Sequence, residues 1–260
     1  MNNEKGKVIK IKELSENIQK KILKCFGRVI GSTKNPNKKL QLSYVRKCGN
    51  YIKFIDNPDK DVQLAAVKQN GCSIQHIKNP DKDVQLEALK EDGCAIIFIN
   101  NPDKDVQLAA VKQDGCSIEF IKNPDKDVQL AAVRKCGNII QFIDNPDKDI
   151  QLEAVKQNGY SIQYIMNPDK DIQLEAVKED GSSIQFINNP DKEISDRIKI
   201  YKTSHRTIYV FRDDNSEFKF SIGCQKNISK HIFIWRIYIT NGGLRENLHR
   251  QEYLDILKQY

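Results

Sequence analysis

The sequence predicts a mainly α fold: an α-solenoid of 22-residue, two-helix repeats with a small C-terminal α+β module. A recurring Asn-Pro pair is the first reason, because it accounts for all eight prolines of the 260-residue chain. A glycine recurs at the same 22-residue interval, from Gly27 to Gly181. The repeat stops near residue 196, after which Tyr, Phe, Trp and β-branched residues dominate. The Asn-Pro pairs begin at Asn35, Asn57, Asn79, Asn101, Asn123, Asn145, Asn167 and Asn189.

Residues 1–34 are expected to form an N-terminal arm and a degenerate capping repeat. Gly27 keeps the repeat interval, but no Asn-Pro-Asp start precedes it. An atypical, charged terminal repeat protects the end of a solenoid from solvent. A basic arm that binds phosphate groups is the alternative. One helical face would carry Leu14, Ile18, Ile22 and Phe26.

The solenoid is expected over residues 35–196, and "NPDKDVQLAAVKQNGCSIQHIK", Asn57 to Lys78, represents one repeat. Proline excludes Asn57 from helical geometry and suits the first turn of a long helix. Gly71 is expected to end that helix in a left-handed conformation. The few residues that follow allow only a short α- or 3₁₀-helix, which Ser73 is expected to cap. The apolar patch of the long helix is too broad for one neighbour, so consecutive repeats must stack.

This pattern resembles the short α-helical repeats of giant-virus and intracellular-bacterial effector proteins, which are catalogued as a domain of unknown function. It is also similar to leucine-rich-repeat-variant and HEAT-like solenoids. The resemblance extends over roughly residues 13–196. It implies stacked helical repeats and no particular activity.

An internal duplication provides a comparison within one chain. "RKCGN" occurs at Arg46 and again at Arg134, an offset of 88 residues or four repeats. Core positions exchange similar volumes between the two copies, whereas several polar positions differ freely. Such variable surface positions are where one repeat gains its own specificity. The predicted partner-binding residues are Lys53, Glu87, Ile97, Glu119, Glu153 and Met166.

The cysteines and His76 are interpreted as structural. Five of the seven cysteines fall at two repeat positions, and Tyr160 and Ser182 replace Cys72 in later repeats. Small buried side chains explain such free exchange better than metal ligands or nucleophiles do. His76 stands where most repeats have phenylalanine. The sequence therefore predicts no metal and no cofactor.

Residues 197–260 are expected to form the α+β module. "TIYVFRDDNSEFKFSIG" predicts two strands around a turn at Asp213–Ser216. Residues 229–240 fit either a strand or a helix. A terminal helix over residues 244–260 would turn four leucines inward, Leu244, Leu248, Leu254 and Leu257.

Catalysis in this module is an alternative with weak support. Cys224, His231 and His249 are the residue types of a zinc site or a thiol–imidazole pair. Their spacing matches no metal motif, and no Gly-rich phosphate loop or nucleophile elbow occurs in the chain. We therefore predict that the protein is not an enzyme.

Charge separates the ends from the middle. Residues 1–34 carry nine Lys/Arg against three Asp/Glu, and residues 197–260 carry twelve against six, so each end has +6. The net charge is +7, which leaves −5 for the repeats. The leading hypothesis is a non-catalytic protein–protein interaction scaffold. The alternatives are a nucleic-acid-binding protein that uses its basic ends and a small enzyme domain carried on a solenoid.

Membrane association is not expected. The N-terminus lacks an apolar signal segment, and no apolar run approaches the length of a membrane span. The sequence therefore predicts an intracellular protein. Its partner's identity and its oligomeric state are left open.

Overall fold

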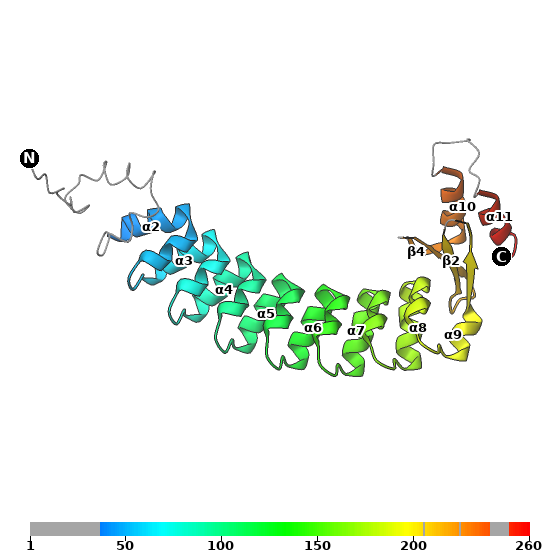
Figure 1. Ribbon diagram of the computed structural model, residues 1–260, viewed down its shortest axis with the longest axis horizontal. Coiled ribbons are helices and arrows are strands. Elements are labelled where there is room, and N and C mark those ends of the chain that lie inside the picture. Colours follow the sequence, from blue (N-terminus) through cyan, green and yellow to red (C-terminus); the bar gives the residue numbers. More distant parts are fainter. Residues whose placement is uncertain (1–36, 205, 224, 240–249) are drawn as a thin grey trace, which may run out of the picture. The chain divides into compact units, whose positions relative to one another are not determined.

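The computed structural model describes residues 37–204, 206–223, 225–239 and 250–260 (Figure 1). It confirms the predicted fold class, with regular helical repeats followed by a four-stranded sheet and short helices. The chain divides into two compact units, Met1–Pro124 and Asp125–Tyr260. The predicted arm and capping repeat over residues 1–34 lie outside the described residues.

Each complete repeat is a ten-residue α-helix followed by a six-residue 3₁₀-helix, as the short second segment predicts. The first unit contains α2 Lys38–Lys47, η3 Gly49–Phe54, α3 Lys60–Gln69, η4 Gly71–His76, α4 Lys82–Glu91, η5 Gly93–Phe98, α5 Lys104–Gln113 and η6 Gly115–Phe120. The second contains α6 Lys126–Lys135, η7 Gly137–Phe142, α7 Lys148–Gln157, η8 Gly159–Tyr164, α8 Lys170–Glu179, η9 Gly181–Phe186 and the short α9 Lys192–Arg197. Within each unit the α-helices stack side by side (Figure 1). In the repeat that begins at Asn57, the buried apolar residues are Val62, Ala66, Val67, Ile74 and Ile77.

The chain turns at each Asn-Pro-Asp, which we call the corner of the repeat. The long helix begins two residues later than predicted from this corner. Helix α3 begins at Lys60, and Asp59 is its N-cap, accepting a hydrogen bond from the Val62 amide at 3.1 Å. Pro58 therefore precedes the helix instead of lying in its first turn. Asn57 has φ 48°, in the left-handed region that asparagine tolerates better than most residues. Asparagine turns the chain, proline stiffens the corner and aspartate starts the helix.

The prediction of a left-handed Gly71 is wrong. The described residues contain one glycine with positive φ, Gly223. A Cβ on Gly71 would instead lie 2.5 Å from the carbonyl oxygen of Ala88 in the next helix. The recurring glycine is thus required by the close approach of consecutive repeats.

Asn70, not Ser73, caps the 3₁₀-helix. The Asn70 side chain accepts a hydrogen bond from the Cys72 amide at 3.1 Å. The Ser73 hydroxyl is buried and donates to the Asn50 side chain of the preceding repeat at 3.1 Å. The Asn70 side-chain amide also donates to Asn50 at 3.4 Å, so side chains on both sides of the glycine connect neighbouring repeats.

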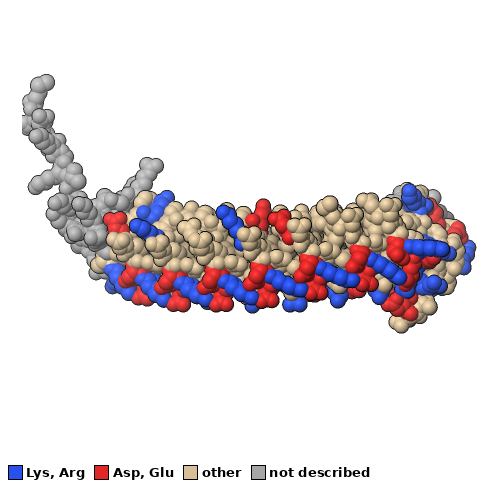
Figure 2. Space-filling view, turned by 90° about the horizontal axis from the view of Figure 1, so that it is seen from below, with Lys and Arg blue, Asp and Glu red and all other residues tan. Residues whose placement is uncertain are grey.

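Within each unit, the lysine at the start of several long helices pairs with the corner of the next repeat. Lys60 lies 3.1 Å from the N-cap Asp81 and also pairs with Asp83. In the second unit, Lys148 lies 2.9 Å from Asp169 and 2.6 Å from Asp171. Figure 2 shows lysines and aspartates alternating along this edge. The further pairs are Lys38 with Asp59 and Asp61, Lys82 with Asp103 and Asp105, and Lys126 with Asp147 and Asp149.

The recurring glutamine also has a structural role. The Gln63 side chain donates to the Pro58 carbonyl of its own corner at 2.8 Å. Gln85, Gln107, Gln151 and Gln173 make the same bond at 2.7–2.9 Å. Lysine and glutamine thus recur because their side chains bond to the corners of the repeats, and not only because repeats were copied.

Acid should weaken these corners. The pKa values of Asp59, Asp81 and Asp103 lie below their ordinary 3.8, first because a backbone N–H donates to each carboxylate and then because of the neighbouring lysine. The stabilisation is therefore complete above pH 3.8 and is lost as pH falls through the lowered values. We expect the melting temperature to be level near neutral pH and to fall below about pH 4.

Asp59→Asn is the matched variant for this prediction, because it keeps the capping oxygen and removes the charge. Its difference in melting temperature from wild type should shrink as pH falls through the lowered pKa of Asp59. Thermal unfolding followed by circular dichroism from pH 2.5 to 7 measures both. A difference that is independent of pH would contradict the ionic role of the corner.

The C-terminal module contains an antiparallel meander. Its strands are β1 Ile198–Lys202, β2 Thr207–Arg212, β3 Phe218–Ile222 and β4 Gln225–Ser229, in that order across the sheet. The turn predicted at Asp213–Ser216 connects β2 and β3. The ambiguous segment 229–240 begins at the last residue of β4 and continues as helix α10, Lys230–Ile239.

Helix α11, Arg250–Leu257, completes the module. Leu257 is buried and Leu254 packs against the same core, as predicted, whereas Leu244 and Leu248 lie outside the described residues. Phe220 stacks on Phe233 of α10 with ring centroids 4.6 Å apart. The buried cluster comprises Ile208, Val210, Phe220, Phe233, Ile256 and Leu257.

The sheet covers the end of the last repeat. Asn227 of β4 accepts a hydrogen bond from the Gly181 amide at 3.0 Å and donates to the Val177 carbonyl at 3.2 Å. Asp214, in the β2–β3 turn, lies 2.6 Å from both Lys178 and Arg197. The module therefore occupies the place where a further repeat would stack.

Candidate interaction surfaces

Within each unit, a row of partly exposed aromatic side chains follows the 3₁₀-helices. We call it the aromatic row: Phe54, Phe98 and Phe120 in the first unit, and Phe142, Tyr164 and Phe186 in the second. Phe54, Phe98 and Phe120 each expose 39% of their surface. Each stands at the last position of its 3₁₀-helix. His76 occupies the same position and is half-buried, and burial lowers its pKa.

A groove beside this row contains two of the predicted binding residues. Ile97, which is 54% exposed, and Glu119 both line it, together with Phe120 and Pro102. Its volume is about 680 Å³. Ile97 and Glu119 occupy the same position in consecutive repeats. Polar side chains, including Gln107 and Lys122, line the groove beside these apolar ones, and such a mixed surface is suited to binding a protein partner.

The other predicted residues do not lie in this groove. Lys53 shares the repeat position of Ile97, and its amine lies 4.9 Å from the Phe54 ring centroid. Met166, in the turn after η8 of the second unit, is 89% exposed. Glu87 and Glu153 lie on the long helices α4 and α7 and form ion pairs there. The structure therefore distributes the six residues over several surfaces.

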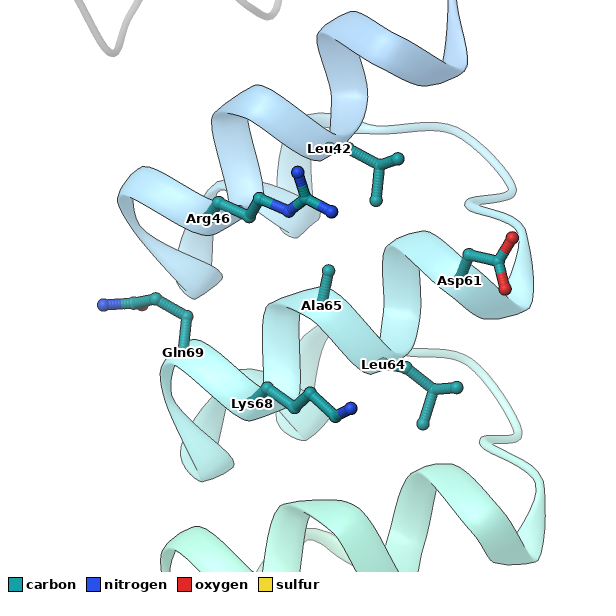
Figure 3. A pocket seen from close by; sticks show the side chains of 7 residues that line it. All are labelled: Leu42, Arg46, Asp61, Leu64, Ala65, Lys68 and Gln69. Carbon is teal, nitrogen blue, oxygen red and sulfur yellow. The ribbon is translucent and has the colours of Figure 1, made fainter.

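A second groove lies between α2 and α3 of the first unit and was not predicted from the sequence. It has a volume of about 570 Å³. Figure 3 shows the Arg46 guanidinium extending from α2 over Ala65 of α3. The sequence does carry one signal for this groove: Ala65 and Glu153 stand at equivalent positions of the duplication, 88 residues apart, but differ. The meaning of that difference depends on the arginine of the preceding helix. The lining residues are Leu42, Arg46, Asp61, Leu64, Ala65, Lys68 and Gln69.

The cysteines are less buried than predicted. Among the described residues Cys72 and Cys94 are half-buried and Cys116 is exposed. The Cys72 thiol donates to the Asp92 carboxylate at 3.0 Å. Burial, followed by this hydrogen bond, raises the pKa of Cys72 to about 11. Cys72 is therefore a protonated thiol at neutral pH, which is a weak nucleophile.

Among the described residues no group of three or more His, Cys, Asp or Glu side chains is arranged to hold a metal ion. Cys224 and His249 of the alternative zinc site lie outside the described residues. In the described part of the chain, no helix combines the length and apolarity needed to cross a bilayer.

Comparison with known families finds a similarity for part of the repeat region. Residues 81–123 and 125–167 each match a domain of unknown function, DUF4116. Each match begins at an N-cap aspartate, Asp81 or Asp125, and ends at the asparagine of a later Asn-Pro pair. The family unit thus corresponds to two 22-residue repeats in tandem. Searches of curated proteins and of solved structures found no significant match.

Proposed function

We propose that the protein is a non-catalytic scaffold that binds an intracellular protein partner through the 3₁₀-helix face of its repeats. The observation that carries this proposal is the groove at Ile97 and Glu119, next to the aromatic row. A few side chains, often aromatic ones, contribute most of the binding energy in many protein interfaces. The stacked helical repeats also support a scaffold, because a solenoid exposes a long, repetitive surface.

Two features favour protein over nucleic acid as the partner. Base stacking needs free aromatic rings, but in the C-terminal module Phe211, Phe220 and Phe233 are buried. The partly exposed rings of Tyr201 and Phe218 pack against Tyr260. The lysines of the repeat edge, such as Lys60 and Lys82, already pair with aspartates. Their charges are therefore poorly placed to contact phosphates.

The internal duplication supplies a test. Ile97→Gln introduces the residue that stands 88 positions later, at Gln185, so the fold should tolerate it. We expect the full-length variant to capture its native partner at least about tenfold less efficiently, because truncating a central apolar contact typically has that effect. Affinity capture from the producing cell, with nuclease treatment in a parallel sample, measures the loss.

Gln163→Ala is the matched control, because Gln163 has the repeat position of Ile97 in the second unit. Its side chain donates to the carbonyl of Tyr160, three residues earlier in the same repeat. This variant should retain capture. Placing a photo-crosslinking amino acid at residue 97 should also label the captured protein. Equal capture by wild type and Ile97→Gln, or capture that nuclease abolishes, would overturn the proposal.

A further inference from the structure

The two copies of the internal duplication differ at one charge pair. In the second unit, Arg134 of α6 donates through Nε to Glu153 Oε1 of α7 at 2.9 Å. Arg46 of α2 stands 88 residues before Arg134, and Ala65 of α3 stands 88 residues before Glu153. The α2–α3 groove thus retains the arginine and lacks the carboxylate.

The missing carboxylate leaves Arg46 without an ion-pair partner among the described residues. Its side chain is exposed and extends over Ala65, with Leu42 beside it (Figure 3). Leu42 and Leu64 are half-buried and supply apolar surface to the groove. The site therefore combines one unpaired guanidinium with aliphatic walls.

The corresponding contact between α3 and α4 contains a carboxylate. Glu87, with 18% of its side chain exposed, lies 3.8 Å from Lys68 and 2.9 Å from Lys90. Glu87 occupies the repeat position of Ala65 and Glu153. This repeat position is alanine at Ala65, Ala109 and Ala131 and glutamate at Glu87, Glu153 and Glu175. Glu87 and Glu153 show that a carboxylate placed here can pair with a cation of the preceding helix.

We propose that the α2–α3 groove binds a glutamate or aspartate side chain of a protein partner, which pairs with Arg46 as Glu153 pairs with Arg134. Leu42 and Leu64 contact an aliphatic side chain next to that acidic residue. Asp61 lines the same groove and is 66% exposed, so a singly charged carboxylate fits better than a doubly charged phosphate. This inference deepens the proposed scaffold function by assigning a chemistry to one partner contact.

The test uses the full-length protein and a helical peptide of about 15 residues that carries one Glu between two Leu residues on one face. A twin peptide has Gln in place of the Glu. Isothermal titration should give one site per chain for the Glu peptide and at least about tenfold weaker binding for the Gln peptide. The NMR signal of the Arg46 side-chain Nε–H should shift when the Glu peptide binds.

Four variants locate the site. Arg46→Gln should weaken binding at least about tenfold, whereas Arg134→Gln should leave it unchanged because that arginine is already occupied. Ala65→Glu should abolish binding by supplying the carboxylate within the chain. Glu153→Ala should open the equivalent α6–α7 groove and raise the stoichiometry from one peptide to two.

Several results would overturn the proposal: no binding of the Glu peptide, equal binding of the Gln peptide, or binding that survives Ala65→Glu. Circular dichroism of each variant separates loss of the site from loss of the fold. Because purified protein and a defined peptide are used, failure here is distinct from failure of partner capture through Ile97.

Discussion

Gly159→Ala is expected to lower the free energy of unfolding by roughly 1–3 kcal/mol, the usual cost of forcing extra volume into a packed contact. A Cβ at this position would lie 2.6 Å from the Ala176 carbonyl oxygen in α8. That oxygen belongs to helical backbone and moves only if consecutive repeats separate. Gly159 does not have positive φ, so the new residue itself is not strained.

Gly181→Ala is the control, because Gly181 has the same position in the last repeat. A Cβ at Gly181 would meet residues of the sheet, and its nearest neighbour would be the Asn227 Oδ1 at 3.3 Å. This variant should unfold within about 1 kcal/mol of wild type, since reduced freedom of the unfolded chain offsets the mild crowding.

Urea unfolding monitored by circular dichroism compares the two glycine variants, and unchanged m-values would show that both unfold from the same compact state. Equal destabilisation by both substitutions would show that the glycine is required by its own backbone geometry. The close approach of neighbouring repeats would then not be the reason for its recurrence.

The glycine shows what periodicity can and cannot predict. The 22-residue interval is sufficient to predict a stacked helical array with one short and one long helix per repeat. It does not reveal why Gly71 is glycine, because the cause is the Ala88 carbonyl of the next helix, 17 positions further along the chain. A left-handed helix end is the commoner reason for such a glycine, and here that conformation belongs to Asn57.

The C-terminal module was predicted less completely. Strands β2 and β3 have a clear alternating pattern around a turn, and both were expected. Strands β1 and β4 were not, because each adjoins a helix and the sequence carries no turn signal at the change. Ile198 follows α9 directly, and Ser229 is followed directly by α10.

The candidate surfaces depended on contacts between repeats. Ile97 and Glu119 were found because they vary at one repeat position, and the structure places them in one groove. Arg46 was missed because it is identical in the two copies of the duplication. Its significance comes from Ala65, 19 residues later, which removes the carboxylate that Arg134 finds in Glu153.

Asn227→Ala is expected to reduce stability on the order of 3 kcal/mol, because several partly buried polar groups would lose partners together. The Asn227 side chain accepts from the Gly181 amide at 3.0 Å and from Ser221 Oγ at 2.9 Å. It donates to the carbonyls of Val177 and Lys178, near the end of helix α8. Its φ of 41° adds a conformational cost for alanine that glycine avoids.

The bond to Gly181 reproduces one made inside the solenoid. The Gly137 amide donates to Gln157 Oε1 of the next repeat at 2.6 Å, and the Gly49 amide donates to Gln69 in the same way. No later repeat supplies a glutamine for Gly181, and Asn227 of β4 supplies the amide oxygen instead. The sheet therefore ends the array of repeats by supplying the same kind of amide acceptor to Gly181 that another repeat would supply.

Asn227→Gly separates the loss of the side-chain hydrogen bonds from the conformational cost of alanine at positive φ. Glycine removes the side chain but adopts the left-handed backbone conformation freely. It should recover roughly 1 kcal/mol of the loss seen with alanine and no more. Hydrogen exchange at the Gly181 amide should accelerate in both variants, because that amide loses its acceptor. If glycine restored wild-type stability and Gly181 stayed protected, the contribution of Asn227 would be conformational alone, and the sheet would hold the last repeat by apolar packing.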